Sequence, residues 1–512
     1  MAEYSIIPQP ASVKYGQGNF KCPGIPGIAS GGDGFAGEAA VFNDQIGQLV
    51  QTAKNFPGAP AVIKSGCIHL SKAQVPGASG KAGDESYRLE ILEGEIKLRA
   101  GSGSGIFRGL QVLRQLFISH YKDGELCIPC GVIEDGPAFS WRGLMLDSSR
   151  NFFTVGFIKK LLDALSLQHI NIFHWHLTDD QGWRLPVKKY PLLTEIGSKR
   201  YDSCEWRHIK GFYTEDEIRD IVSYAEARHI EVVPEVDLPG HASAILAAYP
   251  GLGCTGGPYK VEERYGIFED VLCAGNDGIF DLAEAIFDTL AELFPSKYVH
   301  IGGDEVRFNN WKNCPKCQKR LEELGLGDAP QLQSWITCRL AQMLGKRGKT
   351  VIGWDEILEN TEKFPLPENS VVMSWRGSKG GNEAVALGRQ VIMTPNDSGC
   401  YLDYRNLDHP EEMGRHWGVG TVSQGFNLKP VTAQMGESAA ALVLGGQGNL
   451  WTETVYAGRL AEYLIFPRIC AIGEALWTAA KDRDIKDFEK RLAVHRQRLD
   501  RLDLVQYRGS LG

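Results

Sequence analysis

Tyr298-Val299-His300-Ile301-Gly302-Gly303-Asp304-Glu305-Val306 is the stretch from which the plan of this chain can be worked out. Its first four residues are mostly aromatic or β-branched and predict a short buried strand. Gly302 and Gly303 then allow the backbone to turn without the steric penalty of a Cβ atom. Asp304 and Glu305 follow at once, so the stretch predicts a strand that ends in two neighbouring carboxylates.

The two acids have a chemical and a plain interpretation. Carboxylates this close raise the pKa of at least one partner, and burial raises it further. A protonated acid beside an ionised one is the pair that glycoside hydrolysis requires, as proton donor and as charge stabiliser. The plain interpretation is a solvated acidic turn after a strand. The local sequence leaves both open.

The same unit recurs from Trp141 onward, as an apolar run, polar residues at its end and a segment of helical periodicity. The predicted strands are Gly143–Leu146, Asn171–Leu177, Ile230–Val236, Tyr298–Ile301, Thr350–Gly353, Ser370–Met373, Gln390–Met393 and Ala440–Leu444. Thr214 and Glu217 form a predicted capping box that opens one of the intervening helices. Eight such units close a parallel barrel. We therefore predict an α/β fold, with a (β/α)8 TIM barrel and a C-terminal helix over residues 138–512.

Residues 1–137 predict a small α/β domain that precedes the barrel. Helical periodicity covers residues 42–53, and an apolar run predicts a strand over residues 61–70. Residues 87–91 and 96–100 predict a hairpin, and residues 106–117 predict a helix. This part offers no catalytic set, so we expect it to support the barrel.

Composition narrows the classes of partner. The chain has 512 residues, a formal net charge of −8 and a pI near 5.9, which disfavour nucleic acid or an anionic membrane. No run approaches the ~20 apolar residues of a membrane span. The first residues lack a basic segment followed by an apolar run, so we expect a cytoplasmic protein, unless a leader has been removed.

Twelve cysteines include two Cys-x-x-Cys pairs, at Cys127 and Cys130 and at Cys314 and Cys317. Each pair could be half of a zinc site or a redox pair. The pairs are far apart in sequence, and no histidine near either completes a ligand set. We therefore favour structural or incidental thiols over metal, and expect no metal and no cofactor.

The residues that follow the predicted strands are mostly acids and tryptophans. In such barrels the chemistry lies at the carboxyl ends of the strands. The polar and aromatic residues found there include Asp147, Arg150, Asp179, Asp180, Glu235, Asp237, His241, Asp304, Glu305, Trp354, Glu356, Trp375, Tyr401, Asp403, Trp451 and Glu453. Carboxylates that bind hydroxyl groups, with aromatic walls for ring faces, are typical of carbohydrate sites.

Two alternatives use the same strand ends. His174 and His176 lie on one face of a strand, so with His241 and Asp304 they could form a metal site. That plan requires further histidine or lysine ligands on later strands, where this chain has Trp354 and Trp375. The second alternative is a sugar-binding protein without catalysis, which would not need two acids side by side.

Four motifs together resemble the β-N-acetylhexosaminidases of glycoside hydrolase family 20. They are His300-Ile-Gly-Gly-Asp-Glu-Val306, Trp141-Arg-Gly-Leu-Met-Leu-Asp-Ser-Ser-Arg-Asn-Phe152, Phe173-His-Trp-His-Leu-Thr-Asp-Asp180 and Pro234-Glu-Val-Asp-Leu-Pro-Gly-His241. Gly353-Trp354, Tyr401-Leu-Asp403 and Trp451-Thr-Glu453 are similar to the family's later motifs, so the resemblance covers nearly the whole chain. Asn151 departs from the histidine found in many members.

The resemblance implies substrate-assisted hydrolysis, in which the 2-acetamido group of the sugar is the nucleophile. It implies that Glu305 is the general acid and then the base, and that Asp304 orients the acetamido N–H. It implies that Asp179 and His241 orient Glu305.

For the sugar, the resemblance implies that Arg150, Asp403 and Glu453 bind hydroxyl groups. Tyr401 would hold the acetamido carbonyl between walls formed by Trp354, Trp375 and Trp451. The implied partner is a glycan or glycoconjugate with a terminal β-linked GlcNAc or GalNAc, cleaved from its end. Neighbouring residues of a regular strand face opposite ways, so both acids reach one pocket only if the strand has ended before them.

Overall fold

A computed structural model describes residues 4–29, 34–51, 63–65, 67–75, 85–406 and 413–512. Within them, eight parallel strands close into a barrel in the order β10-β15-β16-β17-β18-β19-β22-β9. Their bounds are β9 Trp141–Asp147, β10 Ile172–His176, β15 Glu231–Glu235, β16 Tyr298–His300, β17 Thr350–Trp354, β18 Val371–Ser374, β19 Val391–Met393 and β22 Val443–Leu450. The predicted TIM barrel is confirmed.

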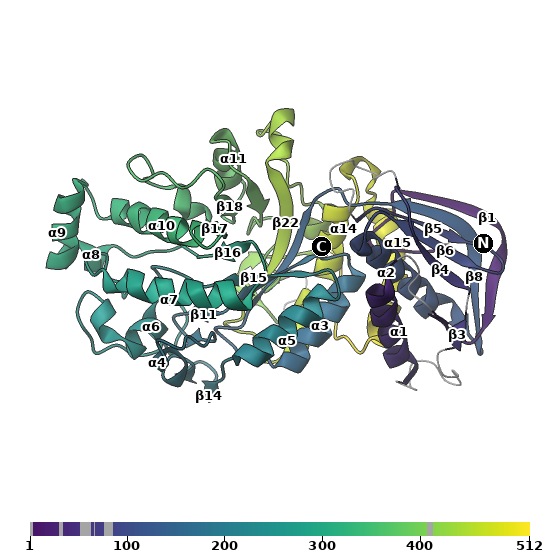
Figure 1. Cartoon of the computed structure of the whole chain (residues 1–512), viewed down its shortest axis with the longest axis horizontal. Helices are drawn as coiled ribbons and strands as arrows, with labels where there is room; N and C mark the ends of the chain where they lie inside the picture. The colour runs from purple at the N-terminus through teal and green to yellow at the C-terminus, as the bar shows by residue number, and fades with distance from the viewer. Residues whose placement is uncertain (1–3, 30–33, 52–62, 66, 76–84, 407–412) are drawn as a thin grey trace.

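Helices follow most of the barrel strands and cover the outside of the barrel (Figure 1). They are α3 Val155–Leu167, α5 Glu215–Glu226, α7 Gly278–Leu293, α10 Pro330–Gly345, α11 Lys379–Ala386, α13 Gly458–Ile465 and α14 Arg468–Trp477. The capping box of α5 is present, with Thr214 and Glu217 bonded to each other's backbone N–H groups. Between β17 and β18 the connection holds only the 3-10 turn η3 Asp355–Leu358.

The eighth strand begins later than the sequence predicted. Residues 437–441, which overlap the start of the predicted run Ala440–Leu444, form the 3-10 turn η4 Glu437–Ala441, and β22 continues instead through Gly445 and Gly446. A Cβ atom on Gly445 would lie 2.0 Å from the carbonyl oxygen of Trp141. The strand therefore requires glycine where it approaches β9, and this removes the apolar side chains that would have marked it.

Other short elements lie in the connections. They are β11 Thr178–Asp179, β12 Gly182–Trp183, α4 Leu192–Glu195, β13 Lys199–Asp202, β14 Arg207–Lys210, α6 Ser243–Ala248, η2 Pro250–Leu252, α8 Asn309–Asn313, α9 Pro315–Leu324, β20 Tyr404–Arg405, β21 Arg415–Val419, α12 Val422–Phe426 and η5 Ala480–Asp482. The connections after β10, β15, β16 and β19 are the long ones, and they build up the carboxyl end of the barrel.

The N-terminal part is a sheet in the order β1-β8-β5-β6-β4, with β7 paired to β8. Its elements are β1 Ser12–Pro23, β2 Pro26–Ile28, α1 Ala36–Gln51, β3 Ile63–Ser65, β4 Ile68–Lys72, β5 Tyr87–Ile91, β6 Ile96–Ala100, α2 Gly103–His120, β7 Tyr121–Lys122 and β8 Glu125–Asp135. The predicted hairpin, β5 and β6, is confirmed. The strand predicted over residues 61–70 is instead two strands in different sheets, β3 and β4, and residues 61, 62 and 66 lie outside the described residues. β1 was missed because its middle residues are polar and exposed.

Helix α2 lies between this sheet and the barrel, and α15 Ile485–Arg501 packs beside it (Figure 1). Glu85 of the N-terminal part accepts hydrogen bonds from Arg108 of α2 at 2.8 Å and from Arg142 of β9 at 2.7 Å. Both guanidinium groups are fully buried. This ion cluster ties the sheet to the amino end of the barrel.

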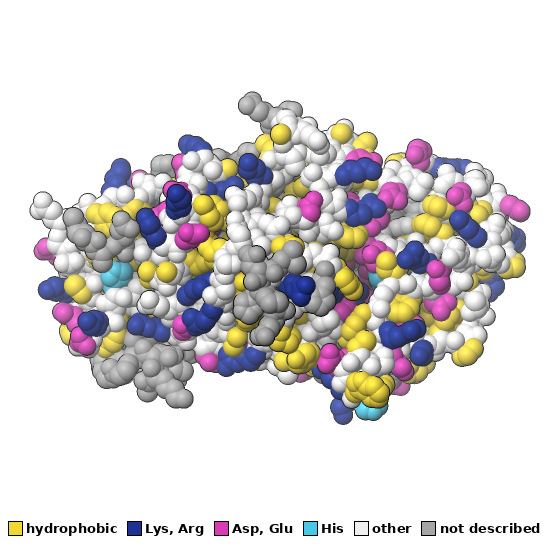
Figure 2. All heavy atoms as spheres, turned by 180° about the vertical axis from the view of Figure 1, so that it is seen from behind, with side chains coloured by type: hydrophobic (Ala, Val, Ile, Leu, Met, Phe, Trp, Pro, Cys, Tyr) yellow, Lys and Arg dark blue, Asp and Glu magenta, His cyan; other side chains and the backbone are white. Residues whose placement is uncertain are grey.

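No helix of the described residues is both long enough and apolar enough to cross a membrane. On the face shown in Figure 2, basic and acidic side chains are interspersed. The net negative charge is therefore not gathered into one patch on that face.

Candidate active site

A cavity of about 450 Å³ opens at the carboxyl ends of the barrel strands. The predicted site residues that line it are Arg150, His241, Asp304, Glu305, Trp354, Trp375, Tyr401, Trp451 and Glu453. Asp179 and Asp403 lie behind this lining, each against a residue that belongs to it. A volume of this size suits a small ligand.

The backbone after β16 explains how two neighbouring acids reach one cavity. The strand ends at His300, and Gly302, Gly303 and Glu305 have φ values of +66°, +91° and +51°. This left-handed path turns Asp304 and Glu305 to the same side. A Cβ atom on Gly302 would lie 1.8 Å from Oδ1 of Asp237, so only glycine fits there.

Asp304 is the buried member of the acid pair. Burial, followed by repulsion from Asp237, raises the pKa of Asp304 well above its usual value. Burial also raises the pKa of Asp237 to about 7. Since the two carboxyl groups are hydrogen-bonded to each other, they hold a proton between them. The other oxygen of Asp304, Oδ1, is buried and has no hydrogen-bond partner among the described residues.

His241 connects the acid pair to the carboxylates behind it. Its Nε2 lies 3.7 Å from Asp304 Oδ2 and 3.6 Å from Glu305 Oε2. Its Nδ1 donates to Asp180 at 2.9 Å and lies 3.2 Å from Asp179 Oδ1. Burial opposes the charged imidazolium, but Asp179 outweighs it, and the pKa of His241 is raised well above its usual value. A cation therefore faces Asp304 and Glu305.

Arg150 lies deep in the same cavity. Its Nη2 lies 2.8 Å from Asp179 Oδ2, and its Nε donates to Gln181 at 3.0 Å. The guanidinium carbon lies 5.1 Å from the ring centre of Trp451. These contacts fix the guanidinium group, which presents hydrogen-bond donors to a ligand.

Aromatic rings wall the cavity. The ring centres of Trp354 and Trp451 are 5.8 Å apart, and Trp375 stacks with Tyr401 at 6.3 Å. Buried carboxyl groups fix two of the indoles, since Trp354 Nε1 donates to Glu235 at 3.0 Å and Trp375 Nε1 donates to Glu356 at 2.9 Å. The rings are therefore held as rigid faces, which suits the apolar face of a sugar.

Glu453 and Asp403 share one cation. Arg415 forms an ion pair with Glu453, and its Nε lies 3.1 Å from Asp403 Oδ2. Asp403 is fully buried, while Glu453 and Arg415 line the cavity. Asp403 therefore faces Arg415, and its direct contact with sugar hydroxyls, which the resemblance implies, stays a prediction.

Sequence reasoning gave no role to two residues that the structure brings to the site, Asp237 and Arg415. Asp237 follows a predicted strand, so the sequence placed it at the carboxyl end of the barrel. Its contact with Asp304 arises because the two strands that precede these acids are neighbours in the barrel. Arg415 lies in the long Gly-rich connection after β19, and no local signal marked it. Tyr404 and Trp417 from the same connection also line the cavity.

The histidines considered as metal ligands lie deeper in the barrel, around Glu235. His174 Nε2 and His176 Nδ1 lie 2.9 and 2.6 Å from Oε2 of Glu235, and His300 Nδ1 lies 3.1 Å from its Oε1. His176 also contacts Asp179 at 2.9 Å. These imidazoles hold a buried carboxylate, and they do not form a set with His241 and Asp304.

A larger cavity, of about 780 Å³, lies at the other end of the barrel. Its lining includes Glu85 and the first residues of β9 and β16, Trp141 and Tyr298. Because chemistry in such barrels is found at the carboxyl ends of the strands, the smaller cavity with the acid pair is the candidate active site.

Two family models match the chain. The one described as glycosyl hydrolase family 20, catalytic domain, matches residues 139–480, and the one described as glycosyl hydrolase family 20, domain 2, matches residues 3–136. Together they span the barrel and the N-terminal sheet.

Curated proteins and solved structures agree with this match. A beta-hexosaminidase of Porphyromonas gingivalis is 41% identical over 422 residues, which cover 81% of this chain and 54% of that protein. This chain thus spans about half the length of that relative. The exo beta-N-acetylglucosaminidase of Vibrio harveyi in complex with N-acetylglucosamine has a TM-score of 0.87 at 30% identity, covering 99% of this chain and 78% of that one. The N-acetyl-beta-hexosaminidase of Streptomyces plicatus in complex with Thio-NAglucal has a TM-score of 0.83 at 29% identity, covering 99% of this chain and 96% of that one.

Proposed function

The chain belongs to glycosyl hydrolase family 20, and from this we propose that it is an exo-acting β-N-acetylhexosaminidase. It removes a terminal β-linked GlcNAc or GalNAc residue with retention of configuration, and the acetamido group of the sugar is the nucleophile. The observation that carries the proposal is the left-handed backbone from Gly302 to Glu305, since it brings both acids to one aromatic cavity.

Asp304 positions the nucleophile. Its unpartnered Oδ1 accepts a hydrogen bond from the acetamido N–H, which turns the amide oxygen toward the anomeric carbon. When the sugar binds, the acetamido N–H and the positive charge that develops on the ring favour ionised Asp304, so the proton shared with Asp237 moves to Asp237 and Asp304 carries the negative charge. That charge stabilises the oxazolinium cation as it forms. A neutral amide oxygen is a weak nucleophile, and its positioning is worth several kcal/mol.

Glu305 moves the proton. Its side chain is 30% exposed, so it reaches both the cavity and the solvent from which water arrives. It donates a proton to the leaving glycosidic oxygen and then takes one from the attacking water. His241, held by Asp179 and Asp180, fixes the direction of the Glu305 carboxyl.

The sugar is bound by the deep end of the cavity. Arg150 donates to hydroxyl groups, Glu453 and Asp403 accept from them, and Arg415 holds these two carboxylates beside each other. Tyr401 donates to the acetamido carbonyl, and Trp354, Trp375 and Trp451 enclose the methyl group and the ring. A cavity closed by Arg150 admits one terminal residue, which explains cleavage from the chain end.

The test is a comparison of leaving groups. Glu305→Gln should lower the rate on a natural glycoside by about 10²–10⁴-fold, because an unactivated alkoxide needs the acid. A nitrophenyl β-GlcNAc glycoside should keep its first step, seen as a burst of nitrophenol. Glu359→Gln, at an exposed acid paired with Arg376, is the matched control and should leave both rates unchanged.

Two results would reject the proposal. One is equal rates of Glu305→Gln and the parent on the natural glycoside. The other is no release of nitrophenol by the parent protein, which would favour a sugar-binding protein. Asp304→Ala should weaken the binding of a thiazoline inhibitor, so unchanged binding would reject the role of Asp304 alone. A matched pair of GlcNAc and GalNAc glycosides gives the substrate preference.

A further inference from the structure

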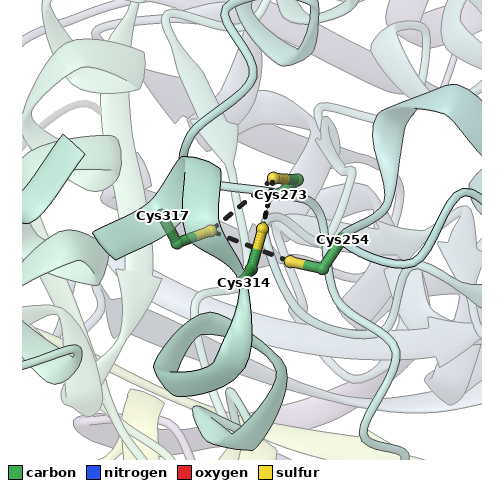
Figure 3. Close-up of side chains that lie close together, drawn as sticks. All are labelled: Cys254, Cys273, Cys314 and Cys317. Carbon is green, nitrogen blue, oxygen red and sulfur yellow. Dashed lines mark hydrogen bonds between the residues drawn. The ribbon is translucent and has the colours of Figure 1, made fainter. Parts of the chain in front are cut away.

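Four cysteines from two connections of the barrel meet at one point (Figure 3). Cys254 and Cys273 lie in the connection between β15 and α7. Cys314 and Cys317 lie between β16 and α10, on either side of the start of α9. Cys273, Cys314 and Cys317 are buried and Cys254 is partly exposed. The four-residue cluster is thus formed by the pair Cys314 and Cys317 together with Cys254 and Cys273, which lie 60 and 41 residues before Cys314 in the sequence.

The sulfur atoms have the spacing of a tetrahedral ligand set. The Sγ atoms are 3.7 Å apart for Cys254 and Cys317, 3.6 Å for Cys273 and Cys317, and 3.8 Å for Cys273 and Cys314. All four lie within 4.8 Å of one another. Zn–S bonds of about 2.3 Å place the corners of a tetrahedron about 3.8 Å apart. All four are free thiols and form no disulfide.

We propose that Cys254, Cys273, Cys314 and Cys317 bind one Zn²⁺ ion as four thiolates. Binding releases four protons to solvent, forms four Zn–S bonds and involves no change of oxidation state. Among the metals found in proteins, four sulfur ligands at this spacing favour zinc or a single iron ion. Zinc undergoes no redox change in such a site and needs no redox partner.

The backbone around the cysteines favours thiolates. The N–H of Gly275 donates to the sulfur atoms of Cys273 and Cys317. A Cβ atom on Gly275 would lie 2.2 Å from the carbonyl carbon of Lys316, so glycine allows this approach. Cys314 is the N-cap of α9, and Cys317 lies in its first turn, where the helix dipole favours negative charge. An apolar thiol cluster would need none of these contacts.

A four-thiolate site has no open coordination position, so the ion is structural. It joins the connection that carries Asp237 and His241 to the connection that carries Asp304 and Glu305. The same two connections meet nearby, since Trp311 Nε1 donates to the carbonyl oxygen of Leu272 at 2.8 Å. Ile267, between Cys254 and Cys273 in sequence, lines the candidate active site. The ion therefore holds one wall of that cavity.

The test begins with the metal content of the intact chain, purified under reducing conditions from zinc-supplemented medium. Elemental analysis should give one zinc ion per chain. The double variant C314S/C317S should retain almost none. The matched control C127S/C130S removes the other Cys-x-x-Cys pair, which lies in β8, and should retain the full amount.

Measurements on the unmodified chain do not depend on whether a variant folds. A mercurial that reacts with thiols should release one equivalent of zinc, detected with a chromogenic chelator. Cobalt(II) added to metal-free protein should give the intense visible absorption of a tetrathiolate site. A strong chelator should lower the temperature of unfolding of the parent and of C127S/C130S.

Three outcomes would overturn the proposal. The parent chain could contain no zinc as purified and take up none when zinc is added. It could contain one iron in place of zinc, with the corresponding colour. Mass spectrometry of protein alkylated without prior reduction could also show the four cysteines joined as disulfides.

Discussion

Gly302 gives the most direct test of the backbone that presents the two acids. Replacing Gly302 by alanine places a Cβ atom 1.8 Å from Asp237 Oδ1, where contacts under 3.0 Å are not found. The groups must therefore move apart by at least 1.2 Å. Asp237 cannot swing freely, because it accepts a hydrogen bond from the N–H of Gly303 at 3.0 Å and shares a proton with Asp304. The displacement is thus passed to Asp304.

Gly302→Ala is expected to lower both the stability of the fold and the catalytic rate. Alanine at a φ of +66° destabilises the fold by about 1–2 kcal/mol. A misplacement of about 1 Å at the reacting groups lowers kcat by roughly 100-fold. Only the loss of stability applies to Gly348→Ala, because Gly348 has a φ of +70° and open space around its Cβ position. Gly348 lies between α10 and β17, at the end of the barrel away from the candidate active site.

The assay compares both variants with the parent by kcat on a nitrophenyl β-GlcNAc glycoside and by the temperature of unfolding. Both variants should lose thermal stability, and Gly302→Ala should lose more, because its overlap with Asp237 adds to the strain of the positive φ. Only Gly302→Ala should lose about 100-fold in kcat. Equal kcat values for the two variants would refute the reasoning, because the contact with Asp237 would then have no consequence for the acid pair.

Two further predictions concern buried carboxyl groups. Burial, followed by repulsion from Asp304, raises the pKa of Glu356 to about 8. Glu356→Gln should therefore have the same KM as the parent at pH 6, where Glu356 is neutral, and a different KM above pH 8. Kinetics between pH 6 and 9 check this, and a difference that does not change with pH would contradict it. Glu85→Gln leaves Arg108 and Arg142 buried without their carboxylate and should cost roughly 3–5 kcal/mol of stability. The control Glu134→Gln, in a partly exposed pair with Arg88, should cost at most about 1 kcal/mol. Although burial opposes ionisation, Arg142 lowers the pKa of Glu85. The difference in free energy of unfolding between the parent and Glu85→Gln, measured with denaturant, should therefore be complete above about pH 5 and shrink as the pH falls through and below about 4. A difference that persists unchanged at pH 3 would contradict this prediction.

The sequence by itself determined the barrel and which polar and aromatic residues stand at its strand ends. Apolar runs that recur with polar ends predict parallel strands, because a strand covered on both faces must be apolar throughout. Asp304, Glu305, Arg150 and the tryptophans then follow from their place after the strands. The eighth strand was predicted to start a few residues too early, because close packing against Trp141 requires glycine at position 445, where an apolar side chain would have marked the strand.

Only the tertiary structure decided which distant residues meet. Asp237 reaches Asp304 because neighbouring parallel strands bring their ends together, and Arg415 reaches Glu453 from a long connection without periodicity. Cys254 and Cys273 join Cys314 and Cys317 for the same reason. Sequence patterns report contacts between residues a few positions apart, while these contacts depend on the closure of the barrel, which fixes in space the ends of segments tens of residues apart.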